Sequence, residues 1–195
     1  MKTVRVMFAI ALLAALLAGG TAAAGDLKNE PGYIDLEWIV IPDDADEIQD
    51  IDLGPALISA AADAEAHGDS ELYKAFKMIK SIRVKSFTMD DASPEIDKAV
   101  DKINKKLKDK DWKRLIYVKD DEEIVTVSTK SVGDDMVGLM VVAYEPGNEV
   151  SFVNVVGDLD LAYLISLAGK LHGDSLAAFL EELEDEGMKI NVEDD

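Results

Sequence analysis

Apolar and polar positions alternate in two stretches of the first half of the chain. In residues 33–41, YIDLEWIVI, apolar side chains alternate with acidic ones until Pro42 and an acidic run follow. Residues 81–89, SIRVKSFTM, have the same period, with two apolar side chains on one face and Arg83 and Lys85 on the other. A period of two is typical of a strand with one buried face. Both stretches are therefore predicted to be strands.

Helical patterns occupy two segments between these strands and one directly after the second strand. Residues 53–67 are rich in Ala and Leu, and Gly68 suits a left-handed cap at the end of a helix. A second helix is predicted to run from Asp69 or Ser70 to about Lys80. A third is predicted over 94–110, because Ser-Pro starts it and its apolar side chains recur at spacings of three and four.

The second half contains four β-rich runs separated by short turn-forming sequences, followed by apolar helical segments at 161–171 and up to about Gly187. Short separators of this kind favour an antiparallel meander. The order of elements predicts an α+β fold, with a mainly antiparallel sheet of five to six strands and helices packed on one face. The four runs cover about 113–119, 122–130, 136–144 and 149–156.

The first 24 residues have the layout of a cleavable signal peptide. Lys2 and Arg5 precede about a dozen apolar residues, and the run ends in small residues up to Ala24. The apolar stretch is shorter than the roughly 20 residues that span a bilayer, so after cleavage we expect no integral membrane protein. We expect residues 25–187 to form a single domain and residues 188–195 an acidic tail. The signal predicts an exported protein, periplasmic or extracellular, and the lack of cysteine in the chain predicts that it has no lipid anchor.

Charge is distributed unevenly along the chain. Beyond residue 24 there are 18 basic and 40 acidic residues, a net charge of −22, which argues against nucleic acid as a partner. Residues 74–119, however, hold 14 basic and 7 acidic side chains. This basic segment either neutralises acidic neighbours within the fold or forms a basic face for an anionic envelope component or an acidic protein.

The second interpretation makes the protein a non-catalytic binding module. Its candidate interaction face joins the long helix to the strand at 81–89. The residues of that face are Arg83, Lys85, Lys98, Lys102, Lys105 and Lys106.

Two alternatives belong to other classes of function. The acidic stretch 43–52 is a weak candidate for calcium, although it lacks the spacing of an EF-hand loop. A hydrolase is the less favoured alternative. The tetrapeptide His-Gly-Asp-Ser occurs twice, at 67–70 and 172–175, and contains the two histidines of the chain, His67 and His172. The end of one helix followed by the start of another explains each copy. No catalytic residue, metal ligand or cofactor is assigned from the sequence.

Residues 112–130 (WKRLIYVKDDEEIVTVSTK) and 138–171 (GLMVVAYEPGNEVSFVNVVGDLDLAYLISLAGKL), placed after SIRVKSFTM and behind an export signal, carry a family resemblance. The chain resembles, over about residues 33–171, the bacterial exported family called domain of unknown function 4252. The resemblance rests on hydrophobic pattern and element order. It implies a small exported α+β domain and supplies no functional residues.

Overall fold

A computed structural model of the chain describes residues 27–65 and 71–164. The predicted signal, both histidines, the last predicted helix and the acidic tail lie outside these residues, as does all but the first turn of the helix predicted at 161–171. In chain order the described elements are η1 (Leu27–Asn29), β1 (Asp46–Leu53), α2 (Pro55–Glu65), α3 (Glu71–Met78), β2 (Ile79–Thr88), α4 (Pro94–Asp109), β3 (Lys113–Asp120), β4 (Glu123–Val132), β5 (Asp135–Glu145) and β6 (Glu149–Leu159).

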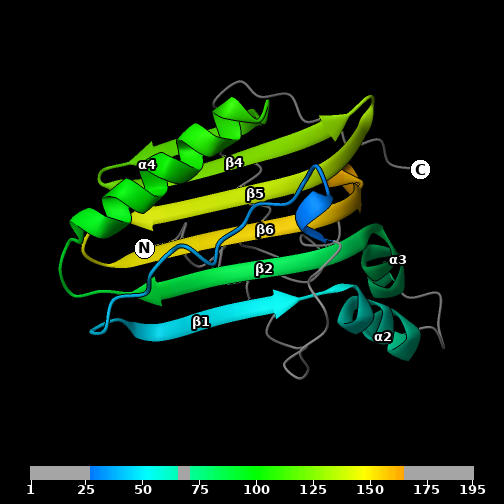
Figure 1. The fold of residues 1–195 in the computed structure, drawn as a ribbon, viewed down its shortest axis with the longest axis horizontal. Helices are drawn as coiled ribbons and strands as arrows, with labels where there is room; N and C mark the ends of the chain where they lie inside the picture. Colours follow the sequence, from blue (N-terminus) through cyan, green and yellow to red (C-terminus); the bar gives the residue numbers. More distant parts are fainter. Residues whose placement is uncertain (1–26, 66–70, 165–195) are drawn as a thin grey trace.

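The six strands form one sheet in the order β1-β2-β6-β5-β4-β3, and every neighbouring pair is antiparallel (Figure 1). This confirms the predicted α+β class and the mainly antiparallel sheet. The meander β3 to β6 follows the four predicted β-rich runs, and α2, α3 and α4 follow the three predicted helices. Short turns dictated this part of the topology, because a few residues can connect only adjacent antiparallel strands.

The described helices divide between the two faces of the sheet, whereas the sequence predicted helices on one face. Ile58 of α2 and Phe76 of α3 share a core cluster with Val84 of β2. Ile103 of α4 belongs to a second cluster with Phe87, which points from β2 to the opposite face. The prediction failed because the apolar pattern of an amphipathic helix identifies the stripe that is buried. It does not identify the face of the sheet on which that stripe packs.

Residues 27–45, here called the strap, cross the face of the sheet that α4 also covers (Figure 1). The strand predicted at 33–41 is wrong, since these residues form neither helix nor strand. Ile34, Leu36 and Ile39 are buried in the core cluster that α4 shares with the sheet, while Asp35 and Glu37 remain partly exposed. Burial does not follow the period of two to the end of the segment, because Ile39 is buried and Val40 is 77% exposed.

Close backbone contact seats the strap on the sheet. A Cβ added to Gly32 would lie 2.0 Å from the carbonyl oxygen of Val137, and one added to Gly138 would lie 2.5 Å from the Cα of Gly32. Both positions therefore require glycine. The strap then leads into β1, which forms within the acidic run because Ile51 and Leu53 face the core shared with α2.

Candidate functional site

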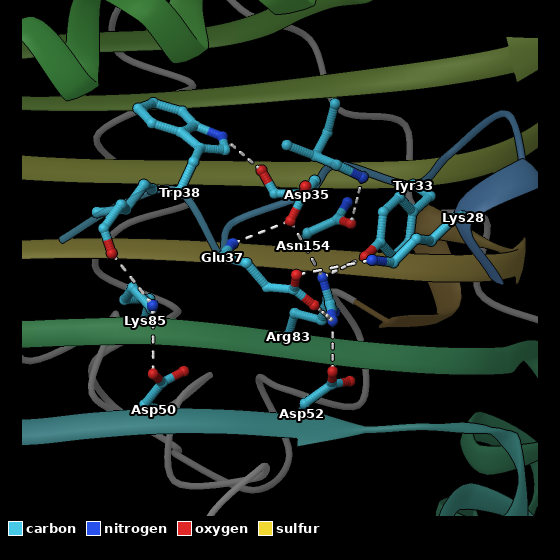
Figure 2. Close-up of polar contacts among 12 residues, drawn as sticks. Lys28, Tyr33, Asp35, Glu37, Trp38, Asp50, Asp52, Arg83, Lys85 and Asn154 are labelled. Carbon is cyan, nitrogen blue, oxygen red and sulfur yellow. Dashed lines mark hydrogen bonds and ion pairs between the residues drawn. The ribbon is translucent and has the colours of Figure 1, made fainter. Parts of the chain in front are cut away.

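Arg83 is the centre of a polar network beneath the strap, shown in Figure 2. Its guanidinium group donates to the hydroxyl of Tyr33 and to Oδ2 of Asp52 on β1. Glu37 Oε1 lies 3.5 Å from Nη2, and Asp35 Oδ1 lies 3.9 Å from Nη1. Arg83 is buried beneath the strap. Carboxylates of the strap and of β1 together neutralise its charge.

Two neighbours of Arg83 hold the strap on the sheet: Lys85 lies two residues along β2, and Asn154 lies opposite Arg83 on β6. Lys85 Nζ donates to the carbonyl oxygen of Ile39 and lies 3.2 Å from Asp50 Oδ2. Asn154 is fully buried; its Oδ1 accepts from the amide of Ile34 at 2.9 Å, and its Nδ2 donates to the carbonyl oxygen of Gly32 at 3.0 Å. These side chains satisfy backbone groups that a strand would have satisfied through a ladder.

The charge around Arg83 shifts the protonation of its neighbours. Burial alone would lower the pKa of Arg83, but the hydrogen bond and charge of Asp52 oppose this, and its pKa is raised. Burial also raises the pKa of the Tyr33 hydroxyl, against the opposing effect of the Arg83 charge. Arg83 therefore remains a permanent cation and Tyr33 a neutral acceptor at physiological pH.

The structure separates the six basic residues of the predicted interaction face into two groups. Arg83 and Lys85 are buried in ion pairs, so they lie beneath the surface that the sequence led us to expect. For these two, the interpretation of internal neutralisation describes what the structure shows. The other group lies on α4 and consists of Lys98, Lys102, Lys105 and Lys106.

The lysines of α4 lie along the flank of the helix that faces the strap. Lys102 Nζ lies 3.9 Å and Lys106 Nζ 4.6 Å from the centre of the Trp38 ring. The indole Nε1 donates to the carbonyl oxygen of Asp35 at 2.8 Å, which fixes the ring beneath the two amines. Lys98 and Lys105 are exposed. We call Lys98, Lys102, Lys105, Lys106 and Trp38 the lysine surface.

Within the described residues, none of the four lysines forms an ion pair. The pairs that do form join residues of the strap, β1 and β2. Burial and the neighbouring charge of Lys102 lower the pKa of Lys106, as expected for two like charges held close together. The lysine surface therefore carries charge that no carboxylate of the described residues neutralises through an ion pair.

The acidic stretch considered for calcium has a structural role in its described residues. Asp50 and Asp52 pair with Lys85 and Arg83. Across 27–65 and 71–164, no group of three or more histidine or acidic side chains is arranged to hold a metal ion.

A hollow of about 420 Å³ lies elsewhere on the described part of the chain. It is lined by Asp134, Asp135, Met136, Asp158, Leu159, Asp160 and Leu161. The carboxylate of Asp160 accepts a hydrogen bond from the amide of Tyr163 and so caps the turn that follows β6.

Sequence reasoning missed most of the network around Arg83. Asp35 and Glu37 were interpreted as the solvent side of a strand, and Asn154 sits in an apolar run with no motif around it. The available signal was the amide side chain of Asn154 within the β6 sequence VSFVNVV, since a buried polar residue in a strand needs a hydrogen-bond partner.

The model of the family described as domain of unknown function (DUF4252) matches residues 43–167. No curated protein and no solved structure matches the chain. Among the described residues, no helix has the length and apolar character needed to cross a membrane. The matched region includes β1 to β6 and all four lysines of the lysine surface, and the chain belongs to this family.

Proposed function

We propose that this member of the family is an exported, non-catalytic binding module that holds an anionic partner on the lysine surface of α4. The observation that carries the proposal is that the four lysines lack ion pairs within the described residues, although the sequence is rich in carboxylates. A cluster of uncompensated cations attracts anionic headgroups, acidic glycans or acidic protein segments.

Trp38 supports this proposal. The ring is held by its indole hydrogen bond and by two amines above it, so its position is set before a partner arrives. Lysines arranged over an aromatic ring are attracted to its face and keep their charge available to a second group. Val40, two residues along the strap, is 77% exposed, so the strap also presents an apolar side chain to solvent. The proposal omits Arg83 and Lys85, because their charges are already paired.

Export is the second part of the proposal. It is supported by the signal-like layout of residues 1–24. Expression of the full chain in a bacterial host, fractionation and mass measurement of the purified protein test this part. Cleavage after Ala24 and recovery outside the cytoplasm are expected, and an uncleaved cytoplasmic product would reject export.

The binding part is tested by co-sedimentation of the purified protein with vesicles that contain an anionic lipid, and in parallel by titration with a soluble acidic polymer. The variant changes Lys98, Lys102, Lys105 and Lys106 to Gln. A control with the same change in charge converts Lys28, Lys74, Lys77 and Lys80 to Gln.

The α4 variant is expected to bind roughly 1,000-fold more weakly, because each of the four lysines near an anionic surface contributes about 1 kcal/mol. Binding by the native protein should fall steeply as salt rises from 0.05 to 0.5 M. The control should retain most of its affinity. Equal binding by the two variants, or no binding by the native protein to either probe, contradicts the proposal.

A further inference from the structure

The two edge strands of the sheet carry opposite charge. β1 contains four acidic residues and no basic one, although Asp50 and Asp52 also pair with Lys85 and Arg83 of β2, whereas β3 contains three basic residues and a single acidic one. Both strands lie at the edges of the six-stranded order and have one neighbour each among the described strands. The charged residues are Asp46, Glu47, Asp50 and Asp52 on β1, and Lys113, Arg114, Lys119 and Asp120 on β3.

Apolar side chains are exposed along the same two edges. Ile48 of β1 is 52% exposed, and Leu115 and Tyr117 of β3 are 39% and 48% exposed. Of the five large hydrophobic side chains exposed in the described part of the chain, these are three. An open edge has unpaired backbone amides and carbonyls and is a template for another strand. Because no further strand pairs with β1 or β3 within residues 27–65 and 71–164, both edges offer there the groups that strand pairing uses.

The topology makes the two edges compatible with each other. Because the sheet has six strands and each runs antiparallel to its neighbour, β1 and β3 run in opposite directions. A second copy placed beside the first in the same orientation would bring its β1 alongside β3 of the first. The junction would continue the antiparallel ladder, with the same face of each sheet on the same side.

Rows of paired residues cross the sheet from β3 to β1, and they indicate which residues would meet if a second copy continued the sheet. The row of paired residues that starts at Arg114 ends at Asp52, and the row that starts at Ile116 ends at Ile51. The row from Lys119 reaches Phe87, which lies next to the irregular part of β1 between Asp46 and Gln49. If each row continues into the next copy without a shift, Arg114 lies opposite Asp52, Ile116 opposite Ile51 and Lys119 beside Glu47 of that copy.

We propose that the protein self-associates head to tail, with β3 of one copy pairing with β1 of the next. Lysine on an edge strand ordinarily prevents pairing, and here it would repel a second β3 edge while attracting a β1 edge. Charge thus disfavours the symmetric pairings β1 with β1 and β3 with β3. A head-to-tail contact leaves one free edge at each end, so copies add in open chains and the assembly grows with concentration.

Single cysteines test the pairing directly, because the chain has none of its own. Val118 and Gln49 lie at the two ends of one cross-sheet row, so Val118→Cys and Gln49→Cys are made in separate chains. The purified variants are oxidised mildly, alone and as an equal mixture. A control pair, Ser59→Cys and Asn104→Cys, places exposed thiols on α2 and α4.

The mixture is expected to give disulfide-linked heterodimers at least fivefold faster than either variant alone gives homodimers, and faster than the control mixture. Preferred homodimers would show a symmetric edge contact and overturn the proposal. Crosslinking no faster than in the control mixture would overturn it as well, because even transient edge pairing brings the two thiols together repeatedly.

A charge exchange provides the second, independent measurement. Lys119→Glu and Glu47→Lys each place like charges at the junction and are expected to weaken self-association severalfold in sedimentation velocity. In an equal mixture every junction regains opposite charges, so association should return to the native level. Failure of the mixture to recover, when both variants are folded, contradicts the head-to-tail register.

Discussion

The free energy of unfolding should depend on Arg83 more than on any exposed ion pair of the strap. We consider the Arg83→Met variant, which keeps an apolar stem of similar length and removes the guanidinium group. In the native protein this group donates to Tyr33 and Asp52 and lies within ion-pair distance of Glu37. Its loss leaves the acidic side chains of the strap and β1 without their shared cation.

The magnitude follows from the burial of the two sides of the network. The Arg83 side chain is 6% exposed, whereas that of Asp52 is 45% exposed. Removing one partner of a buried ion pair costs about 3 to 5 kcal/mol. Because water can reach the remaining carboxylates, we expect the lower end of that range, about 3 kcal/mol. Asp52→Asn should cost only about 1 kcal/mol, since Arg83 keeps Glu37 and the Tyr33 hydroxyl.

Urea unfolding followed by tryptophan fluorescence measures these differences. Trp38 reports on the strap and Trp112 on the core beneath α4. Lys28→Met is the control, because Lys28 pairs with Glu37 at 3.6 Å with both side chains more than half exposed, and exposed pairs contribute about 0 to 1 kcal/mol. If Arg83→Met and Lys28→Met lose the same free energy, the strap is not held by the buried cation and the argument is refuted.

Three further outcomes are expected from the same structure. Asn154→Ala should lose about 2 kcal/mol, because buried backbone groups lose their partners, and hydrogen exchange at the Ile34 amide should become faster. Gly138→Ala should lose about 3 kcal/mol in urea unfolding, since its Cβ would overlap the strap, while Gly133→Ala, with open space around it and a φ of +64°, should lose about 1 kcal/mol. Burial and neighbouring carboxylates raise the pKa of Glu149 to about 6. Because the folded state binds this proton more tightly than the unfolded state does, the free energy of unfolding should fall as pH rises from about 4.5 to 6. Glu149→Gln should remove about 1 kcal/mol of this pH dependence, a value reduced for the partial exposure of the side chain. A flat difference between native and variant urea midpoints across that pH range would contradict the assignment.

Local pattern predicted most of the secondary structure. The period of apolar residues identified α4, and the turn sequences separated β3 to β6, because these features depend on neighbours within a few residues. The strand at 33–41 was wrong for a physical reason. The strap alternates in sequence, but its burial does not, since Ile39 is buried and Val40 exposed, and its backbone bonds to the side chains of Asn154 and Lys85.

The candidate site was predictable only in part. The sequence placed a group of lysines on the outer side of a helix, and the structure places them there without ion pairs within the described residues. The same reasoning grouped Arg83 and Lys85 with them. These two residues face a segment about fifty positions away, and no local pattern states what lies above a strand.

The sequence by itself therefore determined the α+β class, the antiparallel meander and the uneven distribution of charge, since composition and short-range periodicity are properties of the chain. The tertiary structure decided which basic residues are neutralised, which face each helix covers and which strands form the edges. Those outcomes depend on contacts between segments far apart in sequence, and only the folded chain brings Arg83 to Asp52, or leaves Lys98 and Lys105 exposed to solvent.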